Sequence, residues 1–349
     1  MLKKIAVIVL VMLSYVCFYN SAAVPADKFS IAWSHYTGWE PWELARHRGI
    51  LEKWSRKYNI EIRLELVDDY RESINSYTRG THHGCVMTNM DALTIPAMGG
   101  VDSTALIIGD FSNGNDGIVM KNGSKVMDLK NRKVKLVERS VSHYLLARAL
   151  EKNGLTEGDL TLVNTPDADI AAVFASDPDG AVVTWNPLLM QCRNTRGAKL
   201  VFDSRSIPGE IIDLMIVRTD TPDSLKKALV GAWYETMFIM SGKRKSAREA
   251  IGYMADFAGG TEAEFRAQLR TTAMFYKPAD AVAFANSNQL KETMEYVRTF
   301  CFTHTLYGDA DSKDFIGIQF PDKTVMGDKA NIKLRFDSKF MQMAADGQL

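Results

Sequence analysis

The sequence predicts an α/β fold arranged as two lobes. Before Pro222, short apolar runs rich in β-branched residues alternate with longer amphipathic stretches, the pattern of strands and helices in βα units. The chain has 349 residues, which exceeds the usual single domain of about 100–200 residues. Two polar segments, 110–116 and 207–213, interrupt apolar strands and are suited to be crossovers between lobes.

The expected strands are short runs bounded by polar or glycine-containing segments. They are Phe29–Trp33, Ile60–Val67, Cys85–Thr88, Ala105–Gly109, Gly117–Lys121, Val134–Val137, Leu160–Asn164, Ala181–Thr184, Lys199–Phe202 and Leu214–Arg218. The helices expected between them are Pro41–Lys57, Met90–Met98, Val141–Asn153, Asp167–Ala175 and Pro187–Asn194. After Pro222 a mostly helical region is expected, with segments Ser224–Ser241, Ser246–Phe257, Glu262–Arg270, Pro278–Ala285 and Gln289–Cys301.

The two crossovers divide the chain into lobes. Residues 114–212 form an inserted second lobe, and residues 24–113 with 213–349 form the first lobe together with the C-terminal helices. Open α/β sheets bind ligands at the carboxyl ends of their strands, so the cleft between the lobes is the expected binding site.

The N-terminus has the parts of a secretory signal peptide. Lys3 and Lys4 precede an apolar run, 5–18, and small residues follow at 21–23. The apolar run is shorter than the roughly 20 residues that span a bilayer. We therefore expect residues 1–23 to be a cleaved signal peptide and the mature chain to begin near Val24.

Composition excludes several classes of partner. The chain has 42 basic and 42 acidic residues, and this balance favours neither nucleic acid nor an anionic membrane surface. Hydrophobic residues make up 46% of the chain, enough for sizeable cores. The three cysteines Cys85, Cys192 and Cys301 are odd in number and widely spaced, which is typical of neither a disulfide framework nor a zinc site. We expect buried thiols, or at most one disulfide whose two partners the sequence does not identify.

Most of the ligand-binding candidates end or follow predicted strands, Asp213 lies at a crossover, and all of them are polar or aromatic. They are Ser34, Tyr36, Trp39, Thr88, Asn89, Asp91, Glu138, Ser140, Ser142, His143, Thr184, Trp185, Asn186 and Asp213. Asp110 and Asp116 are assigned to the hinge, where their side chains are expected to bond the turn backbone.

Acidic residues dominate this set. Six carboxylates lie at or beside these positions against the single cation Arg139. A buried anion needs Arg, Lys or helix amides, so the balance favours a cation or a neutral hydrogen-bond donor as ligand.

Several candidates also have structural interpretations. Asp91 could cap the helix that begins near Ala92, and Glu138 could pair with Arg139. Either Trp39 or Trp42 could point into the cleft, and Trp185 could belong to its wall or to the core.

No metal or cofactor is expected. His82 and His83 are adjacent on a turn and point apart, which is incomplete ligand geometry for a metal site. His35 and His143 are interpreted as hydrogen-bond partners or as residues at the edge of the core. Phosphate-binding glycine loops and nucleophile elbows are absent from the sequence.

Sequence blocks spread over the mature chain resemble the nitrate/taurine-type branch of ABC-importer binding proteins. The blocks are 110–119, 136–147 and 181–187. Further segments resemble the subgroup encoded beside urea-carboxylase-type enzymes, which is commonly labelled urea-binding and whose association with guanidine metabolism makes guanidine an attractive ligand. These segments are 32–34, 38–42, 87–96, 99–104, 208–213, 315–318 and 333–336.

The resemblance implies a periplasmic binding protein fold that hinges shut around a small solute. It implies a periplasmic, monomeric receptor, not an enzyme, that delivers its ligand to the permease and ATPase of an importer and meets the membrane only through them. Guanidine is the preferred ligand and urea the next, with Asp91 and Glu138 accepting its N–H groups and Trp39 or Trp185 covering its face.

Three alternatives stay open at this point. The ligand could be another small cation or amine, or an anion such as nitrate or taurine. The protein could be an enzyme resembling the pyrimidine-precursor synthases of the same fold, with His35 and His143 in catalysis, although an export signal disfavours that. It could also be a receptor that signals to a membrane kinase.

Overall fold

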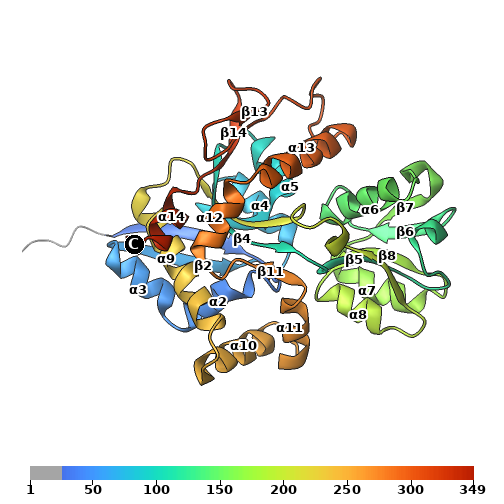
Figure 1. Ribbon diagram of the computed structural model, residues 1–349, viewed down its shortest axis with the longest axis horizontal. Helices are drawn as coiled ribbons and strands as arrows, with labels where there is room; N and C mark the ends of the chain where they lie inside the picture. Colours follow the sequence, from blue (N-terminus) through green and yellow to red (C-terminus); the bar gives the residue numbers. More distant parts are fainter. Residues whose placement is uncertain (1–25) are drawn as a thin grey trace, which may run out of the picture.

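A computed structural model describes residues 26–349 of the chain, and the predicted signal peptide lies outside the described residues. Figure 1 shows a larger lobe that contains the N-terminal and C-terminal parts of the described chain and a smaller lobe built from its middle. Each lobe is a β-sheet with helices packed against it. The predicted α/β fold class is confirmed.

The sheet of the larger lobe has nine strands in the order β13-β12-β14-β4-β10-β3-β1-β2, with β11 also paired to β4. Strands β1, β2 and β3 run parallel, and β10 lies antiparallel between β3 and β4. The strand bounds are β1 Asp27–Trp33, β2 Ile60–Leu66, β3 Gly84–Thr88, β4 Ser103–Ser112, β10 Ile212–Arg218, β11 Thr272–Met274, β12 Gly317–Gln319, β13 Val325–Met326 and β14 Ile332–Phe336.

The helices of the larger lobe pack around this sheet (Figure 1). They are α2 Glu40–His47, α3 Ile50–Lys57, α4 Tyr70–Thr78, α5 Asn89–Ala92 with the π-helical turn η1 Leu93–Ala97, α9 Asp223–Met240, α10 Lys245–Phe257, α11 Glu262–Leu269, α12 Pro278–Ala285, α13 Asn288–Thr303 and α14 Lys339–Ala345.

The sheet of the smaller lobe has five strands in the order β7-β6-β8-β5-β9. Its strands are β5 Asp116–Met120, β6 Lys133–Leu136, β7 Thr161–Asn164, β8 Ala181–Trp185 and β9 Lys199–Asp203. Its helices are α6 Val141–Lys152, α7 Asp167–Ser176 and α8 Leu188–Asn194, with the 3₁₀ turns η2 Val126–Leu129, η3 Glu157–Asp159 and η4 Ser204–Ser206.

Two expected helices are divided. The helix expected over Pro41–Lys57 ends at His47, because Gly49 adopts a left-handed φ of 67° that an α-helix cannot include, and α3 begins after it. The helix expected over Met90–Met98 becomes a short α-helix followed by a π-helical turn that contains Pro96, whose ring is incompatible with regular helical bonding.

The C-terminal region is less helical than expected. Strands β11 to β14 are only 2 to 5 residues long, too short to show a periodic pattern. The longest of them, β14, pairs in parallel with β4. Helix α4 was also missed, since its sequence Tyr-Arg-Glu-Ser-Ile-Asn-Ser-Tyr-Thr is mostly polar.

The chain crosses between the sheets twice, and the two crossings are bonded to each other. Strand β4 ends at Ser112 before β5 begins, and η4 leads back into β10. The hydroxyls of Ser112 and Ser204 lie 2.7 Å apart, and the backbone N–H of Gly114 donates to the Ser204 hydroxyl over 2.7 Å. Because each crossing holds the other, the base of the cleft has a defined geometry.

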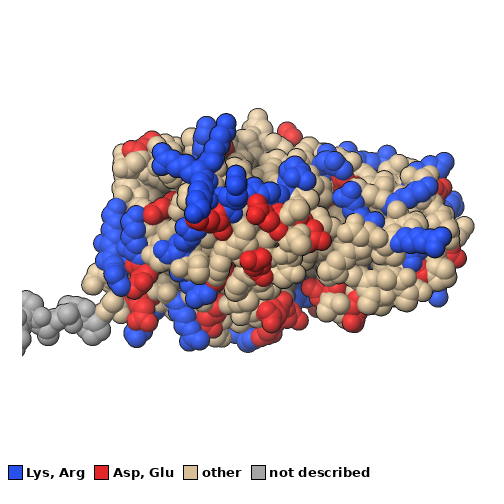
Figure 2. All heavy atoms as spheres, turned by 90° about the horizontal axis from the view of Figure 1, so that it is seen from below, with Lys and Arg blue, Asp and Glu red and all other residues tan. Residues whose placement is uncertain are grey.

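The three cysteines of the described chain, Cys85, Cys192 and Cys301, are buried and unpaired thiols. Within residues 26–349, no helix is both long enough and apolar enough to cross a membrane. Figure 2 shows basic and acidic side chains over both lobes of the face in view.

Candidate functional site

A small cavity lies between the two lobes. Its volume is about 50 Å³, a few times what one water molecule needs. The residues lining it are Ser34, His35, Tyr36, Trp39, Asp68, Tyr70, Thr88, Asp116, Val141, Asp167, Trp185, Ile211 and Asp213.

Parallel strands of both sheets deliver the lining residues at their carboxyl ends. In the larger lobe, Ser34 follows β1, Asp68 follows β2 and Thr88 ends β3. In the smaller lobe, Val141 and Asp167 begin the helices that follow β6 and β7, and Trp185 ends β8. The cavity therefore occupies the position at which open α/β sheets place ligands.

The lining is acidic. Asp68 is exposed and Asp167 is half-buried. Asp116 and Asp213 are each only 3% exposed. No lysine or arginine is among the lining residues of the described chain, and His35 is the one group there that can become a cation. The described cavity thus has two deep carboxylates and no permanent positive charge facing them.

A third carboxylate lies beside the two deep ones. Asp110 on β4 is opposite Asp213 on β10 in the antiparallel register. Burial raises the pKa of Asp213, and the nearby charges of Asp110 and Asp116 raise it further. Burial raises the pKa of Asp110 as well, and that of Asp116 to about 6. Near neutral pH the trio therefore holds protons that isolated carboxylates would lose.

Asp110 is enclosed by the loop after β1. Its Oδ1 accepts a hydrogen bond from the Tyr36 hydroxyl at 3.3 Å, and its Oδ2 is buried without a protein partner. A Cβ at Gly38 would lie 2.3 Å from that Oδ2, so only glycine allows the loop to close over the carboxylate. Asp110, expected at a hinge turn, is thus bonded to a cavity-lining tyrosine.

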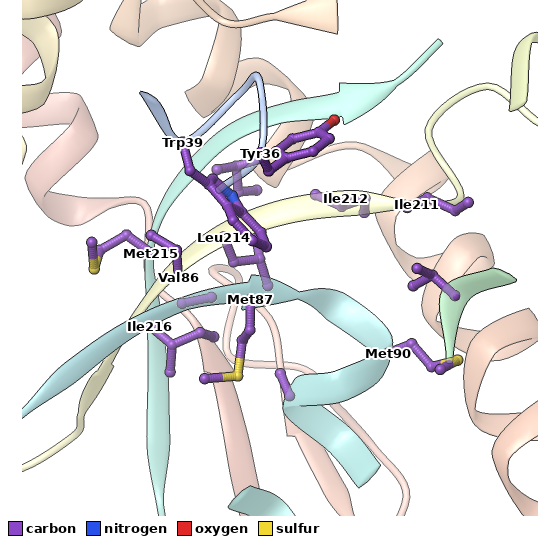
Figure 3. Close-up of a cluster of buried hydrophobic side chains, with 14 of the residues drawn as sticks. Tyr36, Trp39, Val86, Met87, Met90, Ile211, Ile212, Leu214, Met215 and Ile216 are labelled. Carbon is purple, nitrogen blue, oxygen red and sulfur yellow. The ribbon is translucent and has the colours of Figure 1, made fainter. Parts of the chain in front are cut away.

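Aromatic rings form one wall of the cavity. The ring centroids of Tyr36 and Trp39 are 5.0 Å apart, and those of Trp39 and Tyr70 are 5.4 Å apart. Figure 3 shows the Tyr36 and Trp39 rings together beside strand β10, near Leu214. Trp42 packs instead on Trp233, 5.0 Å away, so Trp39 is the tryptophan of this pair that lines the cavity.

Asp91 supports this wall from behind. Its Oδ2 accepts hydrogen bonds from the Tyr70 hydroxyl at 2.7 Å and the Thr88 hydroxyl at 2.8 Å, and the Thr88 backbone N–H donates to the Tyr70 oxygen at 3.0 Å. Burial raises the pKa of Asp91, while these hydroxyl bonds lower it. Asp91 itself is not among the lining residues.

Replacing Tyr70 with phenylalanine is expected to loosen this wall. The change removes a donor to Asp91 and an acceptor for Thr88, which leaves buried polar groups unsatisfied and lowers the free energy of unfolding by about 1–3 kcal/mol. Thermal unfolding followed by circular dichroism measures this effect in Tyr70→Phe and in the control Tyr58→Phe, whose ring packs on Trp54 outside the cavity lining. Equal stability of the two variants would contradict the supporting role.

The structure brings seven of the predicted residues to the cavity. They are Ser34, Tyr36, Trp39, Thr88, Trp185 and Asp213 from the ligand-binding set, and Asp116 from the hinge set. The others do not line it: Asn89, Asp91, Asp110, Glu138, Ser140, Ser142, His143, Thr184 and Asn186.

Most of the residues outside the lining have partners of their own. Asn89 bonds the backbone of Glu210 and Ile212, and Asn186 donates to the Asn115 side chain. Ser140 caps α6, and His143 bonds Glu157. Ser142 and Thr184 are buried with unpartnered hydroxyls, and the Glu138 side chain is half-buried.

Sequence reasoning missed Asp68, Tyr70, Val141, Asp167 and Ile211 as lining residues. Asp68 directly follows a predicted strand, and Asp167 follows another after two residues. The strand-end rule that selected the other candidates would have found both.

A second cavity of about 180 Å³ adjoins the first and shares His35 and Tyr36 with it. It lies between α8 of the smaller lobe and helices α10 and α11 of the larger one. His35 Nδ1 lies 2.7 Å from Glu40 Oε1, and this bond with Glu40 raises the pKa of His35. His35 and Tyr36 therefore lie between the second cavity and the acidic one.

A family model described as NMT1/THI5 like matches residues 113–224 of the chain. No curated protein matches the sequence.

Solved structures show the same fold at low identity. The alkanesulfonate-binding protein SsuA from Xanthomonas axonopodis pv. citri, bound to MOPS, has a TM-score of 0.65 and 16% identity, over 82% of this chain and 96% of that one. The aliphatic sulphonate binding protein SsuA from Escherichia coli has a TM-score of 0.67 and 17% identity, over 81% and 94%. The nitrate-binding protein NrtA from Synechocystis PCC 6803 has a TM-score of 0.57 and 13% identity, over 93% and 99%. The chain thus has the periplasmic binding protein fold.

Proposed function

We propose that this protein is the solute-binding component of an ABC importer and that it captures a small, nitrogen-rich cation. Guanidinium is the first candidate and urea the second. The observation that carries the proposal is the acidic cavity, in which Asp116 and Asp213 are buried beside aromatic rings with no lysine or arginine among the described lining residues. A buried cluster of carboxylates is stable as anions only with a cation to compensate it.

Guanidinium fits the chemistry of this cavity. It is flat, its N–H groups form paired hydrogen bonds with carboxylates, and its face stacks on aromatic rings. Asp213 lies in the larger lobe and Asp116 begins the first strand of the smaller one, so a ligand bonded to both would hold the lobes together. Charge-assisted bonds contribute about 1.5–3 kcal/mol each. Micromolar affinity requires about 8 kcal/mol, so several such bonds together with stacking on an aromatic ring are needed to reach it.

Urea can donate the same bonds but has no charge to compensate the carboxylates. Its affinity should therefore be lower than that of guanidinium by about tenfold or more.

One observation favours a zwitterionic amine such as taurine as an alternative to both. Val141, the first residue of α6, lines the cavity, and a helix N-terminus attracts anions. Ser34 also lines the cavity, and its buried hydroxyl has no protein partner. The amino group of taurine could bind the carboxylates while its sulfonate group contacts the N-terminus of α6 and the Ser34 hydroxyl.

The proposed mechanism is lobe closure around the ligand, followed by recognition of the closed form by the permease. The role is that of a monomeric periplasmic receptor, not an enzyme.

Titration with a ligand panel tests the proposal. Guanidinium, urea, taurine and nitrate are each titrated into the mature protein well below denaturing concentration, and tryptophan fluorescence and melting temperature are recorded, since Trp39 and Trp185 line the cavity. We expect saturation by guanidinium at micromolar concentration, weaker binding of urea and no response to nitrate. A response to nitrate without one to guanidinium would refute a cation site, and binding of taurine alone would select the zwitterionic amine instead.

A further inference from the structure

A cluster of three polar side chains joins the lobes outside the ligand cavity. His143 in α6 and Glu157 in η3 belong to the smaller lobe, whereas His304 follows α13 of the larger lobe. Figure 1 shows the end of α13 reaching toward α6. Both histidine Nε2 atoms contact the same carboxylate oxygen, Glu157 Oε1, at 3.0 Å for His143 and 2.8 Å for His304.

Apolar contacts surround the cluster and continue along the same two helices. The ring of Phe300 stacks on His304 at 4.0 Å and meets the edges of His143 and Tyr144 at 5.6 and 5.2 Å. One exposed face of α13 contributes Tyr296, whose ring lies 4.6 Å from the Arg148 guanidinium. The cluster is thus part of an extended contact between α6 and α13.

The hydrogen bonds determine where the protons lie. His143 Nδ1 accepts the backbone N–H of Arg139 at 3.1 Å, so the neutral ring carries its proton on Nε2 and donates it to Glu157. His304 Nδ1 lies 2.9 Å from the backbone oxygen of Phe300, which can only accept. Its Nε2 faces a carboxylate, so both nitrogens of His304 carry protons and the ring is a cation.

This proton arrangement disfavours a metal ion. The three ligand atoms lie within 4.8 Å of one another, a set that resembles a His₂Glu zinc site. A metal needs a free electron pair on the Nε2 of each histidine. The pair on neutral His143 is at Nδ1, where the Arg139 N–H occupies it.

We propose that the His304–Glu157 ion pair, supported by His143, is a proton-dependent latch that stabilises the contact between the lobes and thereby strengthens ligand binding in the cleft. The effect on affinity rests on the proposed function, while the effect on lobe contact does not. These residues lie outside the lining of the ligand cavity, so they are positioning residues.

The direction of the pH effect follows from the charges. Burial lowers the pKa of His304, but its hydrogen bonds to Glu157 and to the Phe300 carbonyl outweigh this, so the pKa is raised above its usual value. Burial raises the pKa of Glu157, and both histidines bring it down to about 2. The ion pair is therefore complete in mildly acidic solution and is lost as pH rises through the pKa of His304.

The other charged groups on the adjoining elements have their own partners. Arg148 of α6 pairs with Glu210 and Glu151, Arg298 of α13 pairs with Glu295 and Asp314, and Asp159 of η3 pairs with Lys130. Glu157 is the one carboxylate in the described residues that pairs with His304 or His143.

Small-angle X-ray scattering of the ligand-free protein tests the latch without any ligand. The radius of gyration is measured at about pH 6 and about pH 9, on either side of the titration of His304. At the lower pH the wild type should be more compact than Glu157→Gln, and at the higher pH, where the latch is lost, the two proteins should have the same radius. His47→Gln, a surface histidine stacked on Tyr253, should match the wild type. A radius independent of pH in the wild type, or unchanged by Glu157→Gln, would overturn the latch.

The ligand affinities of the same proteins provide a second readout. At the lower pH, Glu157→Gln should bind the cleft ligand about fivefold more weakly than the wild type, near the low end of typical coupling between sites, and the difference should vanish at the higher pH. A constant ratio across pH would overturn the link to binding even if guanidinium binds well. Zn²⁺ that binds the wild type but not His304→Gln would replace the proton latch with a metal site.

Discussion

Replacing Asp213 with asparagine is expected to weaken guanidinium binding by about 100-fold, since one charge-assisted bond and its charge are lost. The side chain is 3% exposed and lines the cavity, so water cannot substitute for it. Asparagine has the same shape, so the change should leave the cavity walls in place. Calorimetric titration of the wild type and the variant measures the effect.

The same substitution should make the empty protein more stable. The pKa of Asp213 is raised in the folded state by burial and by the charges of Asp110 and Asp116. A carboxyl group whose pKa is raised on folding stabilises the folded protein while the group is protonated. This stabilisation is lost as pH rises from the pKa of the group in the unfolded protein through its pKa in the folded protein. Above that window the anion is a net cost, which asparagine removes, so the melting temperature of Asp213→Asn should exceed that of the wild type.

Asp220→Asn is the matched control, because Asp220 is exposed just beyond the opposite end of the same strand. It should change neither affinity nor melting temperature. Loss of binding together with lower stability in Asp213→Asn would mean that Asp213 is a structural residue. Unchanged affinity would remove Asp213 from the site.

Guanidinium affinity should also rise steeply with pH in the acidic range. Burial raises the pKa of Asp116 to about 6 and raises those of Asp110 and Asp213. The cation binds the deprotonated carboxylates, so it must displace their protons. Below the pKa of each such carboxyl group the affinity rises by about tenfold per pH unit, and above that pKa the contribution of that group to the rise levels off. We expect about 100-fold stronger binding at neutral pH than two units below it.

Calorimetry in buffers of different ionisation enthalpy measures the protons released directly. Near neutral pH, binding of guanidinium to the wild type should release protons into the buffer, and Asp213→Asn should release fewer. Tetramethylammonium, a cation that cannot donate hydrogen bonds, is the control and should bind poorly at every pH. Affinity that stays constant from mildly acid to neutral pH would contradict a site built on the Asp110, Asp116 and Asp213 carboxylates.

The strand ends of the site were predictable, and the pairing of its carboxylates was not. Ser34, Thr88 and Trp185 were selected because each follows or ends a predicted strand, and all three line the cavity. Asp91 and Glu138 were selected by the same rule but do not line it. Asp91 turns instead toward Tyr70, a residue on a helix that the sequence pattern did not reveal.

The sequence alone determined the α/β fold class and the acidic, aromatic character of the cleft, because apolar periodicity and strand-end composition are local properties. Only the tertiary structure decided which carboxylates meet. Asp110 and Asp213 are more than a hundred residues apart and become neighbours through the antiparallel register of β4 and β10, and His304 reaches Glu157 only because α13 packs against the other lobe. Such contacts depend on how strands pair and lobes close, which no local pattern encodes.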